Sequence, residues 1–272
     1  MGIINIPANY YEEFDADYSL DVPAEGYGGW KKITLPLNTD TTALVIMHAW
    51  DCGTYEQYPG WHRAVEYIPR AAEIGRTVFP GLLRTVRDSG MQVFHVVAGD
   101  NGYYKKHEGY RFTQSLLTGC NETKEKVRED EVYRKLSEFK QNLGCHNKED
   151  ISRGFENVDF MPEARPAGAE GIAEDESQLF ALCRHFGINH LIYIGFAIDW
   201  CLLLSSGGMK EMKERGLICS TIRQAVTAVE NRETGRNQIC KGIGLWRVAL
   251  LFGFVYELKD FVKSLEGGLW PD

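Results

Sequence analysis

Residues 191–216, which read LIYIGFAIDWCLLLSSGGMKEMKERG, decide the fold of this chain. The stretch opens with an apolar, β-branched run, which is typical of a strand buried in a parallel sheet. After Gly195, Cys201 leads into a helix-like run that ends at Gly216. A strand that breaks into a helix places the first helical residues over the carboxyl end of the sheet, where open α/β sheets hold their sites.

Cys201 occupies this place, and the N-terminus of a helix favours a thiolate. The stretch therefore predicts a nucleophilic cysteine. The alternative is that Cys201 is a small buried hydrophobic residue, as most lone cysteines are.

Strand and helix patterns alternate on both sides of this stretch. We expect further strands at residues 43–47, 91–97, 158–161, 217–222 and 254–256, the last at an edge of the sheet. We expect further helices at residues 74–89, 124–142, 177–186, 237–251 and 258–265, with a kink or break near Pro80 and a turn and loop at 223–229. The alternation predicts one doubly wound, Rossmann-like α/β domain.

Residues 1–40 precede this domain, which we place at residues 41–272. They are rich in Tyr, Asp, Glu, Gly and Pro and show no helical or strand period. We interpret them as an N-terminal extension that wraps over the body or over a neighbouring subunit. The alternative is that part of the extension is flexible.

Composition excludes several classes of function. A net charge of −8 argues against binding to nucleic acid. No run of 18 apolar residues indicates a membrane span, and the N-terminus lacks the pattern of a secretory signal. Seven scattered cysteines without a C-x-x-C pair favour a reduced, cytoplasmic protein.

A family resemblance rests on 42-TALVIMHAWD-51, on 195-GFAIDWC-201 and on the spacing between them. These segments resemble the isochorismatase-like cysteine hydrolases, which include nicotinamidases and N-carbamoylsarcosine amidohydrolases. The glycine, alanine, aspartate and cysteine of the second segment match the family pattern, and Ile198 replaces its usual threonine. The resemblance covers roughly residues 42 to 265 and is weak between 100 and 175.

The resemblance implies a three-layer fold, with a six-stranded parallel sheet of order 3-2-1-4-5-6 and helices on both faces. It also implies an Asp–Lys–Cys triad, a cis peptide bond at Phe196–Ala197 and a homo-oligomer. The cysteine of such a site attacks a carbonyl carbon, and water then resolves the adduct.

Two members of that triad are changed. His48 stands where the family has its aspartate, and no lysine occurs between Lys148 and Lys210. We expect catalytic groups at Cys201, at His48 as base, at Asp51 as an acid–base group and at Arg165 as a fixed cation. The alternatives are a structural histidine, a locally bonded aspartate and a solvated arginine. Asp199 matches the family and is expected to hold the turn before the cysteine.

The loops at the carboxyl edge of the expected sheet are aromatic. We expect a small-molecule substrate to contact Trp50, Tyr103, Tyr104, Phe196, Ala197 and Trp200. The alternative is that these aromatic rings pack against one another. The histidines at 48, 62, 95 and 107 lack a tight ligand spacing, so we expect no metal and no other cofactor.

These features predict a hydrolase of a small amide or related C–N bond with Cys201 as nucleophile. The alternative is a catalytically inactive relative, a pseudoenzyme that keeps the fold for small-molecule binding or for assembly.

Overall fold

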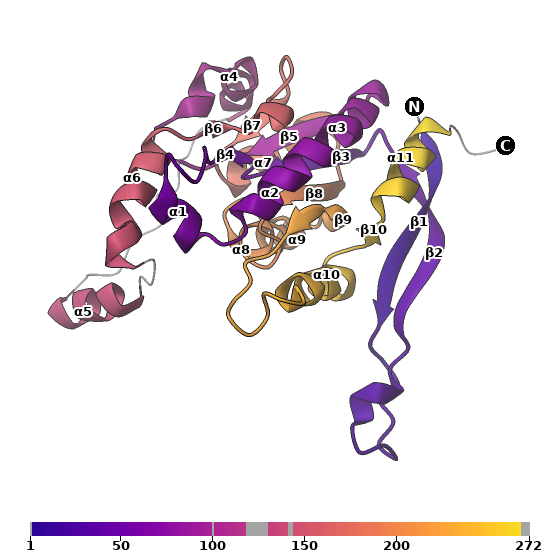
Figure 1. The fold of residues 1–272 in the computed structure, drawn as a ribbon. Coiled ribbons are helices and arrows are strands. Elements are labelled where there is room, and N and C mark those ends of the chain that lie inside the picture. Colours follow the sequence, from indigo (N-terminus) through magenta and orange to yellow (C-terminus); the bar gives the residue numbers. More distant parts are fainter. Residues whose placement is uncertain (1, 100, 118–129, 141–143, 268–272) are drawn as a thin grey trace.

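The computed structural model describes residues 2–99, 101–117, 130–140 and 144–267. It is a mixed α/β protein built on one eight-stranded sheet with the order β2-β1-β10-β9-β8-β3-β5-β7 (Figure 1). The strands of this sheet are β1 Ile3–Glu12, β2 Gly29–Asn38, β3 Thr42–Met47, β5 Gln92–Val96, β7 Gly171–Ala173, β8 His190–Phe196, β9 Ile218–Thr227 and β10 Val255–Tyr256. A separate antiparallel ribbon pairs β4 Trp50–Asp51 with β6 Asp159–Phe160.

Helices connect these strands along most of the chain. They are α1 Pro59–Ala64, α2 Ile68–Thr77, α3 Phe79–Asp88, α4 Glu108–Ser115, α5 Glu131–Lys140, α6 Lys148–Glu156, α7 Glu176–Phe186, α8 Cys201–Leu204, α9 Met209–Glu214, α10 Ile239–Leu251 and α11 Leu258–Glu266. Short 3-10 turns are η1 Pro23–Gly26, η2 Tyr103–Lys106, η3 Cys145–Asn147 and η4 Pro162–Ala164. No helix in the described ranges is both long and apolar enough to span a membrane.

Side chains of the central strands divide between two hydrophobic clusters because successive residues point to opposite faces. Every residue of β3 and β8 is buried, which explains their continuous apolar sequence. Leu44 and Ile46 pack in the cluster that contains residues of α2, α3 and α11. Val45 and Met47 pack in the other cluster, with residues of α7, α8, α9 and α10. The sheet is therefore the middle layer of three.

The sheet differs from the expected six-stranded one. Its parallel part is β7-β5-β3-β8-β9-β10, and these six strands, numbered along the chain, lie in the order 3-2-1-4-5-6. The third of them is β7, within the segment that follows residues 158–161. The expected strand at 158–161 instead gives β6, which pairs with β4. A three-residue strand such as β7 is too short to show a strand pattern in the sequence. The apolar run at 158–161 shows such a pattern but forms β6, outside the main sheet.

The N-terminal residues form two strands that the sequence analysis missed. β1 and β2 pair along ten residues each, from Ile3 opposite Asn38 to Glu12 opposite Gly29. The hairpin joins the main sheet through Asn9 opposite Val255, so β10 is not an edge strand as expected. β1 carries a short alternating pattern, because Ile4, Ile6 and Ala8 pack in the core while Ile3 and Asn5 face solvent, whereas most of β2 is exposed and shows no such pattern.

Three expected boundaries also moved. The helix expected at 74–89 is two helices that meet at Val78, just before Pro80 in the first turn of α3. β9 continues to Thr227, through part of the expected turn. The helix expected after Cys201 is divided into α8 and α9 by residues 205–208. Of the helix expected at 124–142, α5 is the described part, and residues 118–129 and 141–143 lie outside the described residues.

Candidate functional site

Cys201 is the first residue of α8 and follows β8 after a tight turn. The peptide bond between Phe196 and Ala197 is cis, as the resemblance implied. The carbonyl of Ala197 accepts hydrogen bonds from the amides of Trp200 (3.3 Å) and Leu202 (3.0 Å), which fixes the turn. Cys201 itself is partly buried and packs against the hydrophobic cluster that contains residues of α7, α8, α9 and α10.

Gly195 lets β8 approach β3 at the start of this turn. Its φ is +117°, and a Cβ atom built there would lie 2.0 Å from the carbonyl oxygen of Met47. Only glycine avoids that overlap in this conformation. A side chain at position 195 would overlap β3, which explains why the motif has a glycine there in this chain.

Asp199 holds the loop that follows β9. Its carboxylate accepts a hydrogen bond of 2.9 Å from the amide of Val229, and the amide of Ile198 bonds to the carbonyl of Thr227. Burial raises the pKa of Asp199, and the bond from Val229 opposes that effect. Because the carboxylate is engaged in this contact, the structure gives Asp199 a positioning role.

His48 directly follows β3 at the same edge of the sheet. Its φ is +51°, a left-handed value that is uncommon outside glycine, and its amide donates to the carbonyl of Val96 at 3.1 Å. Its ring stacks on Trp50 with centroids 4.8 Å apart and planes 12° from parallel. Burial lowers the pKa of His48 to about 4, so the imidazole is neutral at pH 7.

Buried ring nitrogens gather near this stack. Nδ1 of His48 lacks a hydrogen-bond partner among the described residues. Burial raises the pKa of Tyr103, and a hydrogen bond with the Trp50 indole partly opposes that rise. An unpartnered buried polar atom such as Nδ1 of His48 is uncommon in native interiors and indicates a place where a ligand or water can bind.

The other aromatic residues that we expected to contact a substrate do not all lie at one place in the structure. Tyr104 donates a hydrogen bond of 2.6 Å to Glu174 and packs on Tyr103. Phe196 is 3% exposed and stacks on Phe79 in the core, so its ring faces away from solvent. Trp200 is 61% exposed on the outer surface beside Cys201.

Asp51 lies on the β4–β6 ribbon, and Arg165 follows η4 just after it. Asp51 pairs with Asp159 across the ribbon and accepts a hydrogen bond from the amide of Gly53. Arg165 is largely exposed and reaches the carboxylate of Asp159 at 3.4 Å. Both groups therefore lie next to Asp159, and their described bonds are local.

Tyr67 and Cys52 lie near the expected site, and the sequence analysis did not select them. Burial raises the pKa of Tyr67, and the nearby Cys201 and Cys52 add smaller contributions to that rise. Burial, with a contribution from Asp51, raises the pKa of Cys52 to about 12. Tyr67 lies between α1 and α2, and no pattern in the sequence marks it.

A cavity of about 310 Å³ opens beside this group. Cys201 is not among its lining residues, which are Trp50, Asp51, Cys52, Gly53, Ile68, Pro69, Ala71, Ala72, Glu73, Arg76, Met161, Pro162 and Glu163. The described cavity therefore adjoins the His48–Trp50 stack, on the side of the expected acid–base residue Asp51.

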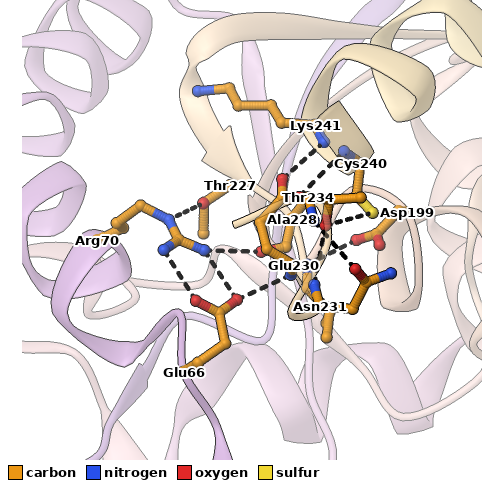
Figure 2. A network of polar contacts seen from close by, with 11 residues as sticks. Glu66, Arg70, Asp199, Thr227, Ala228, Glu230, Asn231, Thr234, Cys240 and Lys241 are labelled. Carbon is orange, nitrogen blue, oxygen red and sulfur yellow. Dashed lines mark hydrogen bonds and ion pairs between the residues drawn. The ribbon is translucent and has the colours of Figure 1, made fainter. Parts of the chain in front are cut away.

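A polar network fastens the loop after β9 over the end of the sheet (Figure 2). Arg70 donates to the hydroxyl of Thr227 at 3.0 Å and to the carbonyl of Ala228 at 3.2 Å, and its guanidinium forms a bidentate pair with Glu66. Glu66 also accepts from the amide of Glu230. These contacts connect α2 and the residues before it to the segment that Asp199 holds.

Glu230 closes the network at the start of α10. Its side chain is buried and accepts from the amides of Cys240 (3.1 Å) and Lys241 (3.0 Å). Burial lowers the pKa of Lys241, as do Arg223 and Arg70. No lysine occurs between Lys148 and Lys210, where the resemblance implies one. Lys241 joins the polar network through its backbone amide, and its side chain points away from the other groups drawn (Figure 2).

The described residues hold no group of three or more His, Cys, Asp or Glu side chains that could bind a metal ion. A buried pair elsewhere, His95 with Glu170 at 2.8 Å, links β5 to the loop before β7. Arg87 completes it with a bidentate contact to the same carboxylate. Sequence reasoning did not find this pair, because its members are 75 residues apart.

No protein-family model matches the sequence, and no curated protein matches it. Solved structures do match its fold. A cysteine hydrolase from Pseudomonas syringae pv. phaseolicola superposes with a TM-score of 0.50 at 14% identity, covering 86% of this chain and 96% of its own. An isochorismatase family protein from Burkholderia thailandensis gives a TM-score of 0.43 at 13% identity, covering 84% and 96%. The resemblance to the isochorismatase-like cysteine hydrolases is therefore confirmed at the level of the fold.

Proposed function

We propose that the chain is a cysteine-dependent hydrolase of a small amide or related C–N bond, with Cys201 as its nucleophile. The observation that carries the proposal is the place of the partly buried Cys201 at the first position of α8, in the turn that contains the cis Phe196–Ala197 bond. The fold shared with a cysteine hydrolase supports it. We also propose that residues 1–40 are an arm appended to a hydrolase-like domain of residues 41–272, in a cytoplasmic protein that binds a small molecule.

The reaction that suits this site has two steps. The sulfur of Cys201 attacks the carbonyl carbon, the C–N bond breaks, and the leaving nitrogen takes a proton. Water then attacks the thioester and releases the acid and the free thiol. Since α8 has only four residues, its N-terminus offers a weaker field than the long helix expected from the sequence.

We assign His48 to the proton transfer in this reaction. Its neutral ring and unpartnered Nδ1 can accept a proton or a hydrogen bond. Burial disfavours the charged imidazole, so a resting thiolate–imidazolium pair is not expected. The histidine therefore acts as a general base, which takes the thiol proton as the sulfur attacks an electrophile. Asp51 on the neighbouring ribbon and Arg165 after η4 remain proposed as auxiliary groups.

Alkylation of individual thiols tests the proposal. Each cysteine would be followed by peptide mass spectrometry during reaction with iodoacetamide at pH 7. We expect Cys201 to react faster than Cys240, which is also a partly buried free thiol, and to slow in His48→Asn. His185→Asn, in α7, is the matched control and should leave the rate unchanged. Equal rates at Cys201 and Cys240 would contradict the proposal.

The second candidate is an inactive relative that binds a small molecule. The observation that favours it is the neutral, buried His48 in the place of the family's aspartate, stacked on Trp50. This reading predicts that a library of planar amides contains ligands that raise the melting temperature but form no adduct with Cys201. A covalent acyl adduct on Cys201, detected by intact mass, would exclude it.

A further inference from the structure

The far end of the N-terminal hairpin is held by its own hydrogen bonds and stands away from the rest of the chain. We define the arm tip as residues 13–28, between β1 and β2. Asp17 organises it, since its amide donates to the carbonyl of Pro23 at 3.0 Å and its carboxylate accepts from the hydroxyl of Ser19 at 2.6 Å. No residue of the tip is buried. Figure 1 shows the tip standing clear of the rest of the chain.

The arm tip carries both exposed apolar side chains and acidic side chains. Its large exposed side chains are Phe14, Tyr18, Leu20 and Val22, with exposures from 40% to 87%. Residues 13–28 contain five acidic residues and no basic residue, a net charge of −5 out of −8 for the whole chain. Clustered exposed apolar side chains with a charged rim mark a binding surface, and the charge specifies a basic partner.

A complementary surface occurs on the same chain. We define the α8–α10 face as the exposed apolar side chains Trp200, Leu204, Ile239 and Ile243. Ile239 and Ile243 share one side of α10 because they are four residues apart. α10 also lies against the turn before Cys201, since a Cβ atom at Gly244 would be 3.5 Å from the amide nitrogen of Asp199.

The rim of this face is basic. Residues 231–251 contain Arg232, Arg236, Lys241 and Arg247 against the single acid Glu233, a net charge of +3. The α8–α10 face therefore matches the arm tip in both apolar character and charge.

The root of the arm lies beside this same helix. Tyr11 packs edge-on against Trp246 of α10 with centroids 6.2 Å apart, and Arg223 lies over the ring of Trp30. The tip projects away from its own α10 (Figure 1), but a two-fold axis midway between the tip and α10 would carry each tip to the α10 of a second copy. Such an interface is self-complementary and closed.

We propose that the arm tip docks on the α8–α10 face of a second copy of this chain, and that the two arms are exchanged reciprocally. The contact would cover Trp200 and Leu204 beside Cys201, so each copy would complete the wall of the other's site. This inference goes beyond the proposed function, because it holds whether or not Cys201 reacts.

The mass of the full-length chain in solution tests it. At about 50 μM, light scattering after size exclusion should give a dimer of 61.6 kDa, twice 30.8 kDa. Tyr18→Ser with Leu20→Ser in the tip, or Ile243→Asp on the face, should each give a monomer. Tyr55→Ser and Leu136→Asp change equally exposed side chains elsewhere and should remain dimeric. A monomeric wild type, or a dimer that neither surface affects, would overturn the proposal.

Mixing the two monomeric variants separates arm exchange from other dimers. The tip variant keeps an intact face and the face variant keeps an intact tip, so a mixed pair retains one of its two contacts. The mixture should regain mass above that of a monomer, and high salt should weaken the pairing. If the mixture stays monomeric, the two surfaces do not bind one another. Cys201 alkylation is measured separately, so failure of either proposal can be recognised alone.

Discussion

Replacing Glu170 by Gln should destabilise the fold by about 2 kcal/mol at pH 7. Burial opposes ionisation of this carboxylate, but hydrogen bonds from His95 and Arg87 lower its pKa to about 2. A drop from 4.5 to about 2 corresponds to about 3.4 kcal/mol if every contribution is present at neutral pH.

One contribution to the lowered pKa of Glu170, the positive charge of His95, is absent at pH 7. Burial lowers the pKa of His95, so its ring is neutral at pH 7 and offers a hydrogen bond but no positive charge. Its Nε2 must then carry the proton donated to Glu170, and Nδ1 remains without a partner among the described residues. Arg87 supplies the charge, from a position that is partly exposed. We therefore reduce the expected effect to about 2 kcal/mol.

Urea unfolding of the wild type and Glu170→Gln from pH 7 to pH 3 measures this value. A carboxyl with a lowered folded-state pKa stabilises the protein above its unfolded pKa, and this stabilisation is lost as pH falls towards the folded value. The difference between the two proteins should thus shrink below about pH 4.5. A difference below about 0.5 kcal/mol at pH 7, or one that does not change with pH, would refute the reasoning.

Three further predictions concern the edge of the sheet. Gly195→Ala should cost more than about 3 kcal/mol, seen as loss of soluble protein or a lower melting temperature, because the new Cβ meets the carbonyl of Met47 in a strained conformation. Arg70→Met should cost about 1–3 kcal/mol in urea unfolding through loss of its bonds to the end of β9, whereas Arg76→Met, at an exposed position, should cost under about 0.5 kcal/mol. The ring protons of His48 should show no titration by NMR between pH 5 and 8, and stability attributable to this residue should fall as pH drops from about 6.5 to about 4.

The pattern of apolar residues predicted the strands that are buried on both faces and missed the strands that are exposed on one face or both. β3 and β8 are continuous apolar runs because helices cover both sides, so the sequence alone located them within a few residues. The hairpin of β1 and β2 obeys another rule. Most residues of β2 are exposed, and pairing with β1 holds the strand without an apolar period. Only the first half of β1, with Ile4, Ile6 and Ala8 in the core, alternates between core and solvent, so most of the extension carries no strand period.

The candidate site also has a part that the sequence predicts and a part that it does not. Cys201, Gly195 and the cis bond belong to one local motif, which a single segment of the sequence contains. Tyr67, Arg70 and Glu230 come from segments that only the folded sheet brings together. The resemblance implies a lysine beside the third strand, whereas the lysine of lowered pKa is the half-buried Lys241, at the start of α10.

The polar network explains how the turn before Cys201 is held in place. Asp199 is fixed by the loop after β9, that loop is fixed by Arg70 and Glu66, and Glu230 fixes the start of α10. Each group satisfies another polar group, so removal of one leaves several without partners. The position of Cys201 is thus maintained by contacts that do not include His48. A substitution at position 48 should therefore leave the turn before Cys201 in place, because the two residues follow different strands.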